Sequence, residues 1–105
     1  MPTLNDITRE TAALSSEKGW PDKSPEERFV YITGELGELA EALLKLQWAS
    51  DVGERSRLAD AVAEEMYDVI WNICDLARLL DIDLDTAAAR KADSDRTRSW
   101  RPGTE

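Results

Sequence analysis

The feature that most constrains this chain is a helical hydrophobic period that runs through two long segments. In both segments apolar side chains recur every three or four residues, which places them along one face of a helix. The first set is Phe29, Ile32, Leu36, Leu39, Leu43 and Leu46, and the second is Leu58, Val62, Met66, Val69, Ile73, Leu76 and Leu80. No convincing stretch alternates with the period of two that a half-buried strand requires. The sequence therefore predicts an all-α fold.

Cap and break signals mark the limits of the first two predicted helices. Thr3, followed three residues later by Asp6, can cap a first helix, which Gly19-Trp20-Pro21 ends. In Ser24-Pro25-Glu26-Glu27, a serine N-cap is followed by proline at the first helical position and by glutamate three residues after the cap. The second helix is predicted to run from this signal to about Trp48.

The second half of the chain gives two more helices. Residues 49–53 are predicted to form a loop, and a long third helix follows to about Leu80. Asp83, with Thr86 three residues later, opens a fourth helix that includes residues 85–91.

The length of the chain, 105 residues with 42% hydrophobic and 33% charged, fits one small domain but not two. Residues 1–105 are therefore predicted to be a single domain with a loose tail from about residue 99. The two long helices are expected to pair antiparallel, with the shorter helices beside them. Because four such helices cover little surface, we expect a homodimer or homotetramer to complete the bundle.

Composition excludes several kinds of chemistry. The chain has no histidine and one cysteine, Cys74, which excludes Ser-His-Asp and Cys-His catalysis, histidine-ligated metals and an intrachain disulfide. A net charge of -9 disfavours binding to nucleic acid and favours a divalent cation as partner. No apolar run reaches the length of about eighteen residues that spans a membrane, and the start lacks a signal-peptide pattern. We therefore expect a cytoplasmic protein that binds neither nucleic acid nor membrane.

Two pairs of carboxylates lie on the two long helices. Glu35 and Glu38 are three residues apart, which separates them by about 60° around a helix. Glu65 and Asp68 repeat this spacing, and Asn72 lies one turn beyond them on the same side. If the helices are antiparallel neighbours, the four carboxylates converge and repel one another unless a cation lies between them. Oxygen ligands alone suit Mg²⁺ or Mn²⁺.

A solvated helix face is the simpler explanation of such pairs, because the chain has 22 acidic residues to distribute. The positions of the pairs favour the cation site. Glu35 and Glu38 alternate with Leu36 and Leu39, so these acids stand at the edge of an apolar stripe. Unpaired charge is costly there.

The segments Gly34–Leu43 (GELGELAEAL) and Glu64–Asn72 (EEMYDVIWN) resemble the all-α nucleoside triphosphate pyrophosphohydrolases of the MazG-like type. The signature of that family is ExxE, an interval and then ExxD, and here 26 residues separate the two pairs. Leu76–Leu84 resembles the family's LA..LGIDL segment with Asp81 in place of glycine. Lys91–Arg96 resembles its KxxxNxR ending with aspartate in place of asparagine.

The resemblance implies Mg²⁺-dependent cleavage of a nucleoside triphosphate between the α and β phosphates, with Mn²⁺ as a possible substitute. By position, Glu35, Glu38, Glu65 and Asp68 would be the metal ligands, with Glu38 and Glu65 as the catalytic carboxylates. Which carboxylate is the general base stays open. Asn72 would orient a ligand or the sugar.

Other residues are candidates for binding the rest of the nucleotide. Lys91 and Arg96 can form a phosphate clamp, although cations are also favoured at a helix C-terminus by its dipole. Trp20 resembles a tryptophan of dCTP-type family members, and Trp20 and Trp48, near helix ends, are candidates to stack on the base. Trp71, within a helix, is expected to be core packing.

Three alternatives remain open at this point. One is a phosphoribosyl-ATP pyrophosphohydrolase, which shares the acidic pairs. The others are a nucleotide sensor without turnover and a non-catalytic oligomerisation module whose acids are merely solvated. The sequence leaves the preferred base and sugar open as well.

Overall fold

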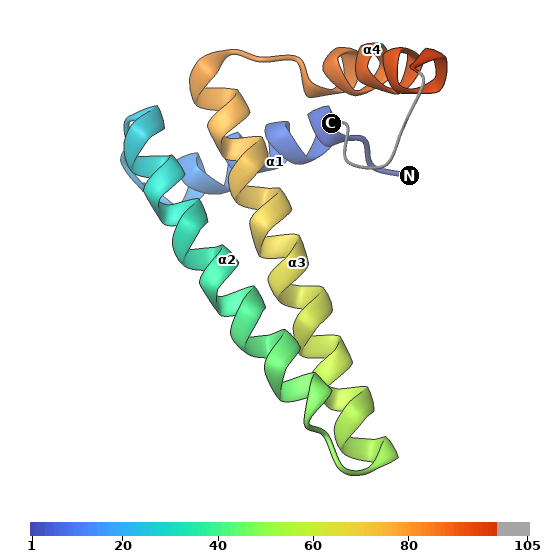
Figure 1. Ribbon diagram of the computed structural model, residues 1–105. Helices are drawn as coiled ribbons and strands as arrows, with labels where there is room; N and C mark the ends of the chain where they lie inside the picture. The colour runs from blue at the N-terminus through green and yellow to red at the C-terminus, as the bar shows by residue number, and fades with distance from the viewer. Residues whose placement is uncertain (99–105) are drawn as a thin grey trace.

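The structure, a computed structural model, describes residues 1–98, and these contain four helices and no strand (Figure 1). The helices are α1 (Leu4–Lys18), α2 (Pro25–Gln47), α3 (Val52–Leu80) and α4 (Leu84–Thr97). The predicted all-α class is confirmed. The predicted tail from residue 99 lies outside the described residues.

Capping side chains account for where the helices begin. The Thr3 and Asp6 side chains each accept a hydrogen bond from the other's backbone N–H, and Ser24 and Glu27 form the same reciprocal pair. The prediction was late by two residues for α3, because Asp51 accepts from the Glu54 backbone N–H at 2.8 Å and so starts the helix at Val52.

Helix ends show two further features. Gly19 ends α1 in the left-handed region with a φ of 68°, which glycine adopts without strain. Asp81 ends α3 in the same region at a φ of 55°, and aspartate is one of the few other residues that tolerates it. The fourth helix continues to Thr97, beyond the predicted segment 85–91.

The helices are arranged around an antiparallel hairpin. α2 and α3 lie side by side along their length, α1 packs against α3, and α4 packs on α1 (Figure 1). The hairpin pairing predicted for the two long helices is therefore present. Buried side chains gather where these helices meet, and they are Thr11, Ser15, Ile32, Val62, Asn72, Cys74, Asp75 and Ala77.

Hydrogen bonds join α1 to α4 at their N-terminal ends. The Asp85 carboxylate accepts from the Leu4 backbone N–H at 3.1 Å, and the Asp83 carboxylate accepts from the Asn5 side-chain amide at 2.8 Å. The Asp85 backbone N–H in turn donates to the Asn5 side-chain oxygen at 3.3 Å. Both helix ends thereby gain partners for N–H groups that have none within their own helix.

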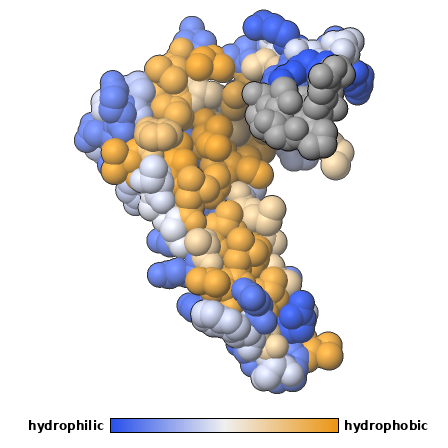
Figure 2. All heavy atoms as spheres, viewed as in Figure 1, coloured by the Kyte–Doolittle hydropathy of each residue, from blue (hydrophilic) through white to orange (hydrophobic). Residues whose placement is uncertain are grey.

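A large part of the predicted apolar stripe is not covered within one chain. Phe29, Leu36 and Leu43, spaced seven residues apart along α2, are 57%, 48% and 49% exposed, and Met66 and Ile73 of α3 are 52% and 42% exposed. Figure 2 shows hydrophobic atoms forming a continuous band over this part of the surface. The radius of gyration is 16.9 Å, compared with about 13 Å for a compact domain of this length. Among the described helices, none combines the length and hydropathy needed to cross a membrane.

Candidate functional site

Three of the four predicted acids converge across the hairpin. Glu35 and Glu38 project from α2 and Glu65 projects from α3, and each of the three contributes a carboxylate oxygen that lies within 4.8 Å of the other two. The pairing of antiparallel helices brings these residues together because each pair lies within one turn of its own helix. Three carboxylate oxygens at this separation can hold one small divalent cation.

Two carboxylate oxygens of this cluster are buried without a hydrogen-bond donor among the described residues. Neither Oε2 of Glu35 nor Oε2 of Glu65 has a hydrogen-bond partner among the described residues, and both atoms are shielded from solvent. A buried carboxylate oxygen without a partner is costly, and a cation removes that cost. This pair of orphaned oxygens is what distinguishes the cluster from an ordinary solvated acidic face.

The electrostatics of the cluster agree with this geometry. Burial, followed by repulsion from Glu38, Asp68 and Glu65, raises the pKa of Glu35 above its usual value. Burial, followed by repulsion from Glu38 and Asp68, likewise raises the pKa of Glu65. Asp68 is exposed and is not one of the three converging residues, but its charge acts on both buried carboxylates. The four predicted acids are therefore close enough for their charges to repel one another.

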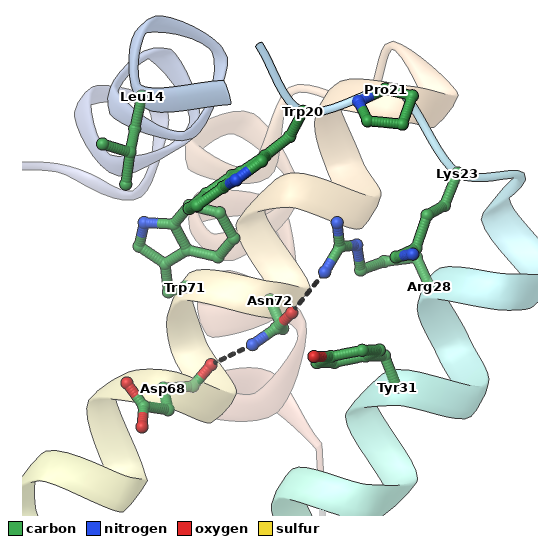
Figure 3. A pocket seen from close by; sticks show the side chains of 9 residues that line it. All are labelled: Leu14, Trp20, Pro21, Lys23, Arg28, Tyr31, Asp68, Trp71 and Asn72. Carbon is green, nitrogen blue, oxygen red and sulfur yellow. Dashed lines mark hydrogen bonds between the residues drawn. The ribbon is translucent and has the colours of Figure 1, made fainter. Parts of the chain in front are cut away.

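An aromatic pocket adjoins the cluster at Asp68. It has a volume of about 510 Å³, and Figure 3 shows the side chains that line it. They are Leu14, Trp20, Pro21, Lys23, Arg28, Tyr31, Asp68, Trp71 and Asn72. Flat aromatic surfaces beside a few polar groups are typical of a pocket that binds a planar heterocycle.

Cations surround the one tyrosine of the pocket. The Lys23 Nζ lies 5.7 Å and the Arg28 Cζ lies 5.5 Å from the centroid of the Tyr31 ring. Both contacts fall within the range of a cation–π interaction. Lys23 and Arg28 therefore give the pocket wall positive charge, whereas Asp68 in the same lining is negative.

Asn72 is held rigidly at the base of the pocket. It is only 6% exposed, accepts a hydrogen bond from Arg28 at 2.7 Å and donates one to the Asp68 backbone carbonyl at 2.8 Å (Figure 3). The residue that was predicted to orient a ligand therefore lines the pocket, one helical turn beyond Asp68 on α3.

The expectation for Trp71 was wrong in one respect. Trp71 was expected to be core packing, but it lines the pocket together with Trp20. Trp71 lies three residues after Asp68, and Tyr31 and Arg28 lie four and seven residues before Glu35. Helical spacing from the acids was therefore the signal that would have found these pocket residues.

Trp48 lies in a different place from Trp20. It is 71% exposed, ends α2 and lines a second, open cavity of about 770 Å³ that reaches Glu38 and Glu65. Within one chain the two tryptophans predicted to stack on the base thus lie on opposite sides of the acidic cluster.

The predicted phosphate clamp lies apart from the acidic cluster in a single chain. Lys91 and Arg96 are on α4, which packs mainly on α1, and neither lines either cavity. Lys91 is paired with Asp95 at 2.9 Å and Arg96 approaches Asp93 at 3.9 Å, and all four side chains are substantially exposed.

The chain is similar in sequence to known proteins over most of its length. Residues 23–99 match the family model described as the MazG nucleotide pyrophosphohydrolase domain. Three mammalian relatives named dCTP pyrophosphatase 1 align over 103 residues, at 34% identity for Rattus norvegicus and 35% for Mus musculus and Homo sapiens. Each alignment covers 92% of this chain and 59% of the relative, so the chain spans less than two thirds of the proteins it matches.

Proposed function

The chain belongs to the family of MazG nucleotide pyrophosphohydrolase domains, and we propose that it hydrolyses a nucleoside triphosphate between the α and β phosphates. The products are a nucleoside monophosphate and pyrophosphate. The observation that carries the proposal is the pair of buried, unpartnered carboxylate oxygens of Glu35 and Glu65 beside an aromatic pocket.

The acidic cluster is proposed to hold Mg²⁺, or Mn²⁺ in its place. Glu35, Glu38 and Glu65 would provide the converging oxygens, and Asp68 would complete the set from the pocket side. Bound Mg²⁺ supplies positive charge that offsets the triphosphate oxygens during the transfer.

Glu38 is the best-placed carboxylate to take a proton. It is exposed, whereas Glu35 and Glu65 each have one oxygen shielded from solvent. In this proposal Glu38 accepts the proton of the attacking water as the bond between the α phosphorus and the bridging oxygen breaks. Glu35 and Glu65 would hold the cation together with Glu38, and Glu65 is essential because it is the α3 member of the triad.

The base is proposed to enter the aromatic pocket. Trp20, Tyr31 and Trp71 offer stacking surfaces, and Asn72 and Arg28 offer polar contacts that fix its orientation. Since the relatives are named for dCTP, dCTP is the first substrate to test.

A second copy of the chain is proposed to complete the assembly as a homodimer or homotetramer. The accessible surface is 7778 Å², compared with about 5,900 Å² for a monomer of 11.8 kDa. The apolar stripe of Phe29, Leu36 and Leu43 accounts for part of the excess. Lys91 and Arg96 line neither of the two cavities described above, so we propose that a role in phosphate binding would come from the assembled form.

The proposal is tested by incubating the protein and Mg²⁺ with each common dNTP and NTP and separating the products. Monophosphate with pyrophosphate is the expected result, whereas diphosphate with phosphate would place the cleavage elsewhere. Glu38→Gln and Glu65→Gln are expected to abolish turnover while circular dichroism stays unchanged. Residual activity above about a tenth in both variants would refute the assignment of the site.

If no product is released from any nucleotide, calorimetry measures whether the protein binds a non-hydrolysable triphosphate. A non-hydrolysable triphosphate that binds only with Mg²⁺ would indicate a nucleotide sensor. No Mg²⁺-dependent binding would indicate an oligomerisation module.

A further inference from the structure

A buried ion network lies behind the aromatic pocket. Its centre is Asp75 on α3, whose side chain is 0% exposed. One Asp75 oxygen lies 2.9 Å from Arg28 on α2, and the other accepts from Arg78 at 2.8 Å. Arg78 also reaches Asp22, in the segment between α1 and α2, at 3.0 Å. Two acids and two arginines make the network electrically neutral.

One arm of the network ends at a residue of the pocket, and the other ends at Asp22, between two pocket residues, Pro21 and Lys23. Arg28 uses one guanidinium nitrogen for Asp75 and another for the Asn72 side-chain oxygen, at 2.7 Å. The other arm, through Arg78, holds Asp22, which is two residues from Trp20. Asp75, Arg78 and Asp22 do not themselves line the pocket. Their effect on a bound nucleotide therefore passes through the side chains that do.

We propose, on the basis of the function proposed above, that Asp75 is a positioning residue for the nucleotide base. Through Arg28 it fixes the Asn72 amide, and through Arg78 and Asp22 it holds the Trp20 segment against the pocket. Arg78 donates to one Asp75 oxygen along a defined line, and the charge of Asp75 holds Arg28 at 2.9 Å from the other oxygen, which has no hydrogen-bond donor among the described residues. Loss of the Asp75 charge would leave Arg28 buried with one partner fewer and free to turn away from Asn72.

The network also affects which side chain is able to donate a hydrogen bond to a bound nucleotide base. Both Asn72 contacts are within the protein: the side-chain oxygen accepts from Arg28 and the amide nitrogen donates to the Asp68 carbonyl. The orientation of this amide is therefore set before any ligand arrives. The buried Nε of Arg28 has no hydrogen-bond partner among the described residues, and it is the donor left for an acceptor atom of the base.

The test compares Asp75→Asn with the wild type in steady-state pyrophosphate release, using the substrate that the wild type cleaves best. KM is expected to rise by about tenfold or more, with kcat changed by less than about threefold. The Mg²⁺ concentration for half-maximal activity should stay unchanged, because Asp75 is not in the acidic cluster. Asp60→Asn, an exposed acid on the same helix that lines neither cavity, is the matched control and should behave as wild type.

Variants of the other two residues in the Arg78 arm keep the proposal testable if Asp75→Asn does not fold. Arg78→Gln and Asp22→Asn should each raise KM as well, by a smaller factor than Asp75→Asn. In a Trp20→Ala background, Asp22→Asn should have no further effect, since the segment it holds no longer carries the aromatic ring. A merely structural role would instead lower the melting temperature and leave the ratio of KM to kcat unchanged.

The outcomes separate this proposal from the function on which it rests. A wild type that releases no pyrophosphate from any triphosphate would contradict the proposed function. An active wild type with a KM for Asp75→Asn within about twofold of its own would overturn the positioning role alone. Equal losses in kcat and in Mg²⁺ response would also overturn it, because they would show that the acidic cluster had been disturbed.

Discussion

At the residue scale, the acidic cluster stores electrostatic repulsion that a cation relieves. Glu35 and Glu65 have raised pKa values because burial and neighbouring carboxylates disfavour their charged forms. A raised pKa in the folded state means that the folded chain binds more protons than the unfolded chain above pH 4.5. The stabilising effect of the proton is complete below the unfolded value and is lost as the pH rises through the folded value.

We therefore expect the metal-free protein to lose stability as the pH rises from about 4.5 toward neutrality. Glu35→Gln removes one of the repelling charges, so without metal at pH 7 the variant should melt at a higher temperature than the wild type. Added Mg²⁺ should stabilise the wild type and have little effect on the variant. Thermal unfolding in EDTA and in Mg²⁺ across this pH range measures both effects. A lower melting temperature for Glu35→Gln in EDTA would contradict the prediction.

Trp71 is the pocket residue on which a second residue-scale prediction rests. Stacking of a base on an aromatic ring contributes about 1–3 kcal/mol, so Trp71→Ala should weaken nucleotide binding by about 5- to 150-fold. Trp48→Ala is the comparison, because Trp48 lies in the other cavity. Titration with a non-hydrolysable triphosphate and Mg²⁺ measures both affinities. If the two variants bound equally well, the base would have to lie elsewhere.

At the scale of elements, the joint between α1 and α4 depends on ionised aspartate. Hydrogen bonds from Asn5 and from Thr86 lower the pKa of Asp83 to about 2, although burial opposes them. A lowered pKa in the folded state gives stability that is present above the unfolded value of 3.8 and is lost as the pH falls through about 2.

This joint is expected to open in acid before the hairpin of α2 and α3 does. Between about pH 4 and pH 2, the protection of the α4 amides against hydrogen exchange, taken relative to their intrinsic exchange rates, should fall. Asp83→Asn keeps a side-chain acceptor at the helix N-cap but has no charge to lose, so its α4 protection should change less over this range. An identical acid response in the two proteins would show that another group controls the joint.

The sequence predicted the elements and the acidic cluster well, and it predicted the pocket poorly. Capping side chains such as Ser24 act on N–H groups three residues away, so the starts of helices are encoded locally. Spacing within one helix likewise determined that Glu35 and Glu38 share a face. The pocket depends on how α1 and the segment after it cross α3, which no local pattern specifies. Trp71 was misassigned for that reason.

At the scale of the whole molecule, the apolar stripe on α2 and α3 stays exposed to solvent in a single chain. Exposed hydrophobic side chains at seven-residue spacing are typical of a helix that packs against another helix. The position of the stripe relative to the acids leaves the acidic cluster uncovered. Glu35 and Leu36 are neighbours in sequence and lie about 100° apart around α2, on either side of the buried Ile32.

A charge placed in this stripe should break the assembly. Sedimentation of the wild type is expected to give an even multiple of the 11.8 kDa chain mass, and Leu36→Lys should shift it toward the monomer. Val52→Lys, at the exposed first residue of α3, is the control and should leave the mass unchanged. A monomeric wild type at micromolar concentration would contradict the proposed oligomer.

The meeting of α1 and α4 has a consequence for the order of folding. The hydrogen bond between Leu4 and Asp85 joins residues 81 apart in sequence, whereas α2 and α3 need only the short turn between Gln47 and Val52 to pair. Loop closure costs entropy that grows with loop length, so we expect the hairpin to form first and α4 to dock late. Contacts made after the rate-limiting step govern how fast a protein unfolds rather than how fast it folds. We therefore expect loss of the α1–α4 joint to speed unfolding more than it slows folding.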